Sequence, residues 1–349
     1  MERFANSKAG SDAIVANFIY SRPDRCDACG TELHPWLSGV RDRVYGVDGQ
    51  WNLFRCGNGA CAAAYLDARL TGEQLGSFYA TYSTHSDPVL MASGAKRGFR
   101  QAIDWFLHRN LGYRRPEAST GTSILARFFG VVPFLRHTAL SRVFWLPHVA
   151  EGKLVEIGFG NAQTLLQMRE LGWDVEGIEF DAICVDNART LGLRVGEGDF
   201  RAQNYADGSL DAVVGSHVIE HVPDPGELIA AIHDKLAPGA RMVLITPNGK
   251  SLGCRLMGAD WRGLETPRHL TIQTPGSLMR HARRAGFRTV RVFGTSLGGG
   301  ILQQSVQIRR GKPAVHTGRM AQLFWAVIAS TVHLVWADAS DEIVLFCEK

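Results

Sequence analysis

Apolar, strand-like segments alternate with helical segments from residue 153 to the end of the chain, and this alternation constrains the fold more than any other feature. Short apolar runs of this kind are typical of strands buried in a parallel sheet. Strands joined through helices of this length form a parallel sheet with helices on both faces. The expected strands are 153–157, 174–180, 193–198, 210–216, 240–248, 288–294 and 341–349, and the expected helices are 161–172, 181–192, 225–239 and 275–287.

The turn after the first expected strand carries two glycines, Gly158 and Gly160. Glycine lets backbone approach a ligand closely, and the helix that follows offers its N-terminus, so the turn predicts a nucleotide-type ligand. A dinucleotide fingerprint requires a third glycine at position 163, where this chain has Gln163. Glu179, at the end of the second strand, can accept hydrogen bonds from two ribose hydroxyls, but this is equally true of NAD-binding proteins.

The motifs after later strands narrow the ligand class. The segment EGDF (197–200) places Asp199 where a carboxylate can accept the adenine amino group, with Phe200 beside the ring. The remaining motifs, in chain order, are SHVIEHVPDP (216–225), LAPGARMVLITPN (236–248), PRHL (267–270) and AGF (285–287). With this ordered set, residues 150–294 resemble class I S-adenosylmethionine-dependent methyltransferases, especially the group that contains the ubiquinone-pathway O-methyltransferases and the methyltransferases of bacterial glycan gene clusters.

That resemblance implies an α/β, Rossmann-like sheet of seven strands, the last of them antiparallel, and S-adenosylmethionine as the cofactor. One departure from the family is Ala162, where many members have glycine and where a small residue should still fit. The positions that the resemblance assigns to the cofactor are Glu156, Gly158, Phe159, Gly160, Glu179, Asp199, Phe200 and the backbone around Ser216.

The segment HVIEH predicts a catalytic cluster, because one helical turn would present His217, Glu220 and His221 on a single face. In one interpretation His221 is a general base, Glu220 is structural and His217 lines the cofactor pocket. In another, these three side chains and His269 hold a second divalent metal, as similar acid and histidine sets do in ubiquinone-type and small-RNA 2′-O-methyltransferases. Here His217 replaces the first acid of that set, which would favour a borderline metal over magnesium. Purely structural roles are the third interpretation.

The segment DWRGLETPRHL (260–270) resembles an acceptor-side loop. Trp261 would provide a flat apolar surface, and Arg262 and Arg268 could bind phosphate or carboxylate groups.

Two close cysteine pairs near the N-terminus, Cys26 with Cys29 and Cys56 with Cys61, suit a tetrahedral structural zinc, with a lapsed or redox-active pair as the alternative. The segment from residue 51 to 86 resembles the N-terminal zinc-binding segment of the glycan-cluster methyltransferases. That resemblance implies that Tyr79, Tyr82 and His85 could reach the acceptor, although an aromatic helix face docked on the core explains them equally well.

Two apolar stretches suggest contact with a membrane surface. Residues 320–336 carry no charged side chain but are slightly short for a bilayer span, so we expect a core or lid helix, with interfacial attachment and a bilayer span as the alternatives. Residues 125–147 place arginines among aromatic residues, which is typical of an interface. Packing of the two stretches against each other would explain both.

These features predict three parts: a zinc-binding segment (1–70), a helical linker or acceptor-side cap (71–150), and a methyltransferase domain (151–349) with an insertion at 295–341. The N-terminal residues lack the apolar core of a secretory signal, so we expect a cytoplasmic protein, with peripheral attachment to the inner membrane face as an option. The net charge is only +4 and the sequence has no dense run of Lys and Arg, so no nucleic-acid partner is expected.

The sequence therefore predicts a methyltransferase that acts on a small-molecule or glycan acceptor, most simply a hydroxyl of a sugar, nucleotide-sugar or lipid-linked glycan. A metal-dependent O-methyltransferase for quinones or small aromatic compounds is the second hypothesis. A non-catalytic scaffold that retains the cofactor fold is the third.

Overall fold

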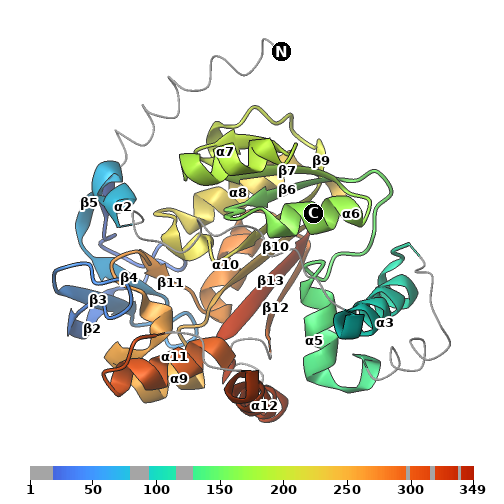
Figure 1. The fold of residues 1–349 in the computed structure, drawn as a ribbon. Coiled ribbons are helices and arrows are strands. Elements are labelled where there is room, and N and C mark those ends of the chain that lie inside the picture. The colour runs from blue at the N-terminus through green and yellow to red at the C-terminus, as the bar shows by residue number, and fades with distance from the viewer. Residues whose placement is uncertain (1–18, 79–93, 115–128, 296–298, 315–318, 337–338) are drawn as a thin grey trace.

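The computed structural model describes residues 19–78, 94–114, 129–295, 299–314, 319–336 and 339–349. A seven-stranded sheet lies at its centre in the order β12-β13-β10-β9-β6-β7-β8 (Figure 1). β13 is antiparallel to both neighbours, while β10, β9, β6, β7 and β8 are parallel, which confirms the predicted sheet. The strands are β6 (Lys153–Ile157), β7 (Asp174–Glu179), β8 (Arg194–Glu197), β9 (Leu210–Ser216), β10 (Leu236–Pro247), β12 (Thr289–Gly294) and β13 (Glu342–Glu348).

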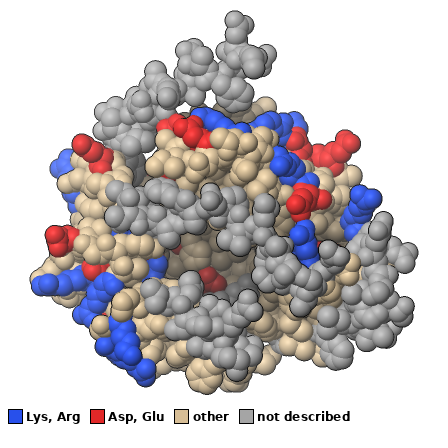
Figure 2. Space-filling model, in the orientation of Figure 1, with Lys and Arg blue, Asp and Glu red and all other residues tan. Residues whose placement is uncertain are grey.

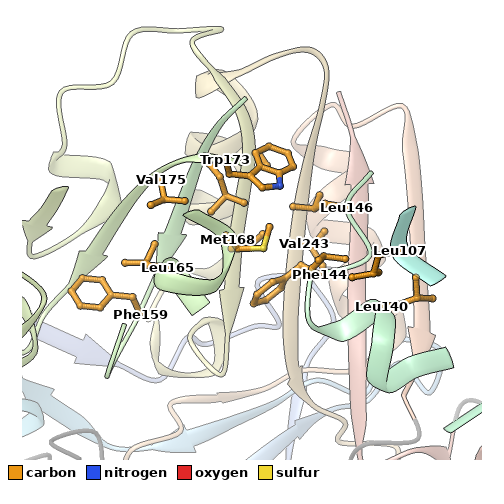
Figure 3. Packing of buried hydrophobic residues seen from close by; sticks show 14 of the residues in the cluster. Leu107, Leu140, Phe144, Leu146, Phe159, Leu165, Met168, Trp173, Val175 and Val243 are labelled. Carbon is orange, nitrogen blue, oxygen red and sulfur yellow. The ribbon is translucent and has the colours of Figure 1, made fainter. Parts of the chain in front are cut away.

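Helices cover both faces of this sheet because its strands alternate apolar side chains between two cores. Leu154 and Val243 belong to one core, whereas their neighbours Val155 and Met242 belong to the other. Figure 3 shows part of the first core, in which α6 residues Leu165 and Met168 pack beside Trp173 and Val175. The helices of the first core are α3 (Gly94–Leu111), α5 (Pro133–Ser141), α6 (Gln163–Glu170) and α7 (Ala182–Thr190), and those of the second are α8 (Pro225–Lys235) and α10 (Pro275–Arg284).

One helix ends earlier than the sequence predicts. The predicted helix over 225–239 stops at Lys235, and Leu236 begins β10, where it pairs with Leu210 of β9. Leu236 is fully buried, so pairing with the sheet decides its conformation.

The cysteine-bearing segment is built onto the C-terminal domain through a shared sheet with the order β11-β4-β3-β2. β11 (Thr271–Ile272) comes from the C-terminal region, and it pairs antiparallel with β4 (Ala64–Asp67). The other N-terminal elements are β1 (Ile19–Ser21), β2 (Leu33–Val40), β3 (Trp51–Cys56), β5 (Arg69–Thr71) and α2 (Gly72–Ser77).

The insertion between β12 and β13 forms α11 (Gly299–Arg309) and α12 (Arg319–Val335). The apolar stretch 320–336 is thus a helix, which packs against α11 and α5. None of the helices in the described part of the chain combines the length and apolar character needed to cross a membrane.

Candidate active site

The turn between β6 and α6 has positive φ values at both glycines of the sequence pattern. Gly158 and Gly160 have φ values of 69° and 50°. A Cβ at Gly158 would lie 2.4 Å from a Val218 methyl group, so only glycine fits there. Ala162 also has a positive φ, 59°, at the start of α6, where a small side chain is accepted.

Glu179 lies directly against this turn. Its Oε2 accepts a hydrogen bond from the Gly160 amide at 2.9 Å, and its Oε1 accepts one from the Phe180 amide at 2.7 Å. Burial raises the pKa of Glu179, and the backbone hydrogen bonds oppose that rise. The carboxylate is therefore fixed at the end of β7, beside the turn that approaches a ligand.

Glu156 is a second buried carboxyl beside the turn. Burial raises its pKa to about 8, a hydrogen bond with Thr164 opposes the shift, and the charge of Glu179 adds to it. Its Oε2 has no hydrogen-bond partner among the described residues. A buried acceptor without a partner is costly, and a cationic or hydrogen-bond-donating ligand group would satisfy it.

The residues predicted to contact the adenine ring, Asp199 and Phe200, differ in how accessible they are. Asp199 accepts hydrogen bonds from the backbone and side chain of Arg201, while remaining partly accessible. Phe200 is buried and stacks on Tyr205. Its place beside a ligand ring stays a prediction. Phe159 is also buried in the core. The sequence analysis did not name Phe180, which follows Glu179 directly and is 55% exposed. A large apolar residue immediately after the acid could have marked it as a candidate ligand contact.

A cavity of about 460 Å³ opens next to this turn, at the ends of β9 and β10. Its volume is ordinary for a small-molecule site. The polar lining is mostly neutral amides and hydroxyls, together with Arg142 and Glu342, and the apolar lining includes Trp145. The full lining is Ser141, Arg142, Phe144, Trp145, Asn161, Gln163, Thr164, Gln167, Ser216, Ile245, Thr295 and Glu342.

His217 lies between two carboxylates, one of which belongs to the cavity. Its Nε2 is 2.9 Å from Glu342 Oε1, and its Nδ1 is 3.2 Å from Glu220 Oε1. Burial opposes a charge on the ring, but the two carboxylates outweigh it and hold the pKa of His217 well above its usual range. Glu342, the first residue of β13, gave no local sequence signal.

The predicted helical turn over HVIEH does not form. His217 has a φ of 55°, and only Ile219–His221 form a short 3₁₀ helix. His217 therefore reaches Glu220 because its backbone is in the left-handed conformation, and not because the two residues are three positions apart on a helix.

A second polar group brings together Glu220, His221 and His269, whose ligand atoms lie within 4.8 Å of one another. His221 Nδ1 lies 3.0 Å from the Arg268 carbonyl, and His269 Nδ1 lies 2.8 Å from the Gly263 carbonyl. In the neutral rings these contacts place the proton on Nδ1 and the lone pair on Nε2, an arrangement that metal-binding histidines commonly show. Burial and the neighbouring His221 lower the pKa of His269 to about 4. His217 is not part of this group, which corrects its inclusion in the predicted ligand set.

The segment 260–270 faces inward, contrary to the predicted acceptor-side loop. Trp261 is buried and donates a hydrogen bond to Asp341 at 3.0 Å. Arg268 is fully buried and pairs with Asp42 at 3.0 Å and with Glu265, while Arg262 also pairs with Glu265. The two arginines thus bind internal carboxylates.

The comparisons with known proteins identify the family of the chain. A family model described as "Methyltransferase domain" matches residues 132–292. A ubiquinone biosynthesis O-methyltransferase of Cupriavidus pinatubonensis is 31% identical over 170 residues, which cover 44% of this chain and 68% of that relative. The chain belongs to the class I S-adenosylmethionine-dependent methyltransferases.

Two further proteins are similar to this methyltransferase. A ubiquinone biosynthesis O-methyltransferase of Xanthomonas axonopodis pv. citri is 29% identical over 158 residues, covering 42% of this chain and 66% of that relative. The solved structure of a methyltransferase from Archaeoglobus fulgidus, described as dependent on S-adenosylmethionine, is 17% identical, with a TM-score of 0.44 and coverage of 65% of this chain and 98% of that chain.

The residues around the turn fit the cofactor of this family. The Glu179 carboxylate beside the turn would accept hydrogen bonds from the ribose hydroxyls, and the Oε2 of Glu156 is a buried acceptor that a donor group of the cofactor would satisfy. Gly158 and Gly160 give this turn its positive φ values and carry no side chain.

The four cysteines of the methyltransferase's N-terminal segment meet in one cluster. Cys26 Sγ lies 3.6 Å from Cys61 Sγ, and Cys29 Sγ lies 3.4 Å from Cys56 Sγ. Thiolates around a tetrahedral zinc lie about 3.8 Å apart, so the donor set and its spacing fit this ion. Tyr79, Tyr82 and His85 lie outside the described residues.

The raised pKa of Glu156 predicts a pH-dependent stability of the cofactor-free enzyme. The unfolded carboxyl titrates near 4.5 and the folded one near 8, so folding binds a proton, and this contribution to stability is lost as the pH rises through that window. Glu156→Gln cannot ionise, and we expect the variant to gain on the order of a few kcal/mol over the native chain at about pH 8. The two should converge near about pH 4.5.

Denaturant unfolding of both chains across this pH window measures the effect. Glu227→Gln is the matched control, because Glu227 has 73% of its side chain exposed. Parallel pH profiles for the native chain and the Glu156→Gln variant would show that Glu156 titrates normally.

Proposed function

We propose that this methyltransferase methylates a hydroxyl group of a sugar-like acceptor, that is, a sugar, nucleotide-sugar or lipid-linked glycan. The observation that carries the proposal is the lining of the cavity beside the cofactor turn. Asn161, Gln163, Gln167 and several hydroxyl side chains can bind acceptor hydroxyls, and Trp145 offers an aromatic surface on which a sugar ring can pack.

In this reaction the protein's side chains would position the acceptor hydroxyl and remove its proton. Bound S-adenosylmethionine would supply an electrophilic methyl group on a sulfonium: the acceptor oxygen would form a bond to the methyl carbon as the carbon–sulfur bond breaks and S-adenosylhomocysteine leaves. Glu342 lies in the cavity with its Oε1 fixed by His217, which leaves Oε2 to accept the proton of the acceptor hydroxyl. His221 does not line the cavity, so we assign the base role to Glu342 in place of the predicted His221.

A second candidate is metal-dependent O-methylation of a quinone precursor or small aromatic compound. Two observations favour it. Glu220, His221 and His269 offer one carboxylate and two imidazoles within 4.8 Å, a donor set that a borderline divalent metal accepts. The relatives at about 30% identity are named ubiquinone biosynthesis O-methyltransferases.

Calorimetry and methyl transfer test the proposal in sequence. We expect S-adenosylmethionine to bind in the micromolar range and Glu179→Ala to weaken binding about tenfold or more, because the only carboxylate against the turn's Gly160 amide among the described residues is removed. Glu176→Ala, three residues earlier on β7 and paired with Arg194 at the surface, is the control. Absence of binding by the native chain would favour the scaffold hypothesis.

Transfer of labelled methyl to a panel of nucleotide-sugars, lipid-linked saccharides and catechols then distinguishes the two enzymes. Label on a saccharide that persists in a chelator supports the proposal. Label on a catechol that a chelator abolishes and magnesium or manganese restores supports the second candidate.

A further inference from the structure

The outward side of α12 carries several exposed apolar side chains, with the polar Thr331 among them. Phe324, Val327 and Leu334 are 60%, 57% and 66% exposed, and their spacing places them on one side of the helix. The opposite side packs on the protein, where the His333 ring contacts His137 of α5 at 4.8 Å between ring centroids. Burial of apolar surface therefore fixes the helix on one side and leaves a second apolar side uncovered in the monomer.

Neighbouring elements extend this apolar side into a surface. Val131 and Val132 are exposed just before α5, and Leu256 is exposed on α9 (Leu252–Met257). The Arg255 guanidinium lies 4.7 Å from the Trp336 ring, which joins α9 to the end of α12. We call this the α12 surface; its members are Val131, Val132, Leu256, Phe324, Val327, Leu334, Val335 and Trp336.

The charged side chains beside the α12 surface are mainly basic. Residues 299–336 contain no Asp or Glu but include four basic residues. Of these, Arg310 and Lys312 are exposed just after α11, and Arg309 pairs with Asp260 at 3.2 Å. Figure 2 shows basic side chains gathered at the lower left, where Figure 1 places α9 and α11, beside an uncharged lower edge near α12. Exposed apolar side chains with a basic border are complementary to anionic lipid headgroups over an acyl interior.

We propose that the α12 surface docks on the face of an anionic lipid bilayer, with α12 lying in the plane of the interface. The segments that carry this surface also border the cavity. Ser141 ends α5, and Thr295 and Glu342 flank the insertion that contains α12. If the proposed function holds, docking brings the cavity to the headgroup level, where the saccharide of a lipid-linked acceptor lies.

Vesicle co-sedimentation of the full chain tests the proposal without an acceptor. Mixed phosphatidylglycerol and phosphatidylcholine vesicles should pellet the protein at low salt, and phosphatidylcholine alone should do so less well. Replacing Phe324 and Val327 together by Ser should reduce apparent vesicle affinity at least about tenfold, because two exposed apolar side chains no longer enter the interface. Ile19→Ser is the matched control, since Ile19 is 51% exposed on β1 and lies outside the α12 surface.

A charge variant gives a second readout. Arg310→Gln combined with Lys312→Gln should reduce the preference for anionic vesicles and its sensitivity to salt. S-adenosylmethionine affinity, measured on every variant, shows that the fold is retained and separates this test from failure of the proposed enzyme function.

Three results would overturn the proposal. The native chain could stay in the supernatant with both vesicle types, or it could pellet equally with the Phe324 and Val327 variant. Light scattering could instead show a dimer that the same variant dissociates, in which case the α12 surface binds a second copy of the chain.

Discussion

Replacing Glu342 by Gln should lower kcat by about 100-fold or more and leave the affinity for S-adenosylmethionine unchanged. The magnitude follows from the usual contribution of a positioned general base. Glutamine keeps the size of the side chain and can still contact His217, but its amide cannot take a proton from the acceptor hydroxyl. Glu156, Glu179 and the glycine turn are unaltered, so cofactor binding should persist.

The matched control is Glu348→Gln at the other end of β13. Glu348 pairs with Arg241 at 3.0 Å, is partly exposed and does not line the cavity. Its replacement should change kcat less than about twofold. If Glu342→Gln turns over normally while His221→Gln is inactive with full cofactor binding, then His221 is the base after all.

A spectroscopic readout separates the catalytic role of Glu342 from a merely structural one. Two carboxylates hold the pKa of His217 above its usual range, and Glu342 is one of them. Titration of the His217 ring by NMR should therefore show a lower pKa in Glu342→Gln than in the native chain, with the remaining elevation due to Glu220. An unchanged His217 pKa would mean that the pair does not form in solution.

The central sheet could be predicted from the sequence because its physical cause is local. Residues such as Leu154 and Val155 are apolar at consecutive positions, since opposite faces of the same strand enter different cores. The glycine turn could also be predicted, because its positive φ values favour glycine. The position of Glu179 beside the turn could be predicted because it is the last residue of the neighbouring strand.

The remainder of the site depends on contacts between distant parts of the chain. Glu342 reaches His217 from 125 residues away, and Arg268 is neutralised by Asp42 from 226 residues away. Neither pairing produces a recognisable pattern in the local sequence, so neither could be predicted. Tertiary packing also decides which aromatic side chains are exposed: it buries Phe200 against Tyr205 and leaves Phe180 at the surface.

Loss of the cysteine cluster is the second change for which we expect a large effect. Backbone hydrogen bonds connect this cluster to the group of Glu220, His221 and His269. Thr274 Oγ1 donates a hydrogen bond to the Cys61 carbonyl, and β4, which follows Cys61, pairs with β11. The Leu66 amide donates to the Leu270 carbonyl at 2.9 Å, and the Leu270 amide donates to the Glu220 carbonyl at 2.9 Å. Loss of the cluster should therefore disturb Glu220 and the adjacent His269.

Cys61→Ser should reduce bound zinc from one ion per chain to almost none and destabilise the fold by roughly several kcal/mol. We expect methyl transfer to fall with it, while S-adenosylmethionine binding falls less, because Glu156, Glu179 and the glycine turn belong to the central sheet. Atomic emission, thermal unfolding and calorimetry measure the three quantities. Cys184→Ala on α7, outside the cluster, controls for loss of a buried thiol and should retain zinc.

Mass spectrometry after alkylation tests the competing interpretation of the same cysteines. The sulfur contacts pair Cys26 with Cys61 and Cys29 with Cys56, so a redox pair would appear as protected thiols that a reductant exposes. A purified native chain without zinc and with these thiols protected would replace the metal with disulfides. These disulfides would link residues 26 and 29 to residues 61 and 56 within the N-terminal segment, so stability and activity would depend on reductant instead of chelator. Cys61→Ser would then keep only the Cys29–Cys56 link and respond less to reductant than the native chain.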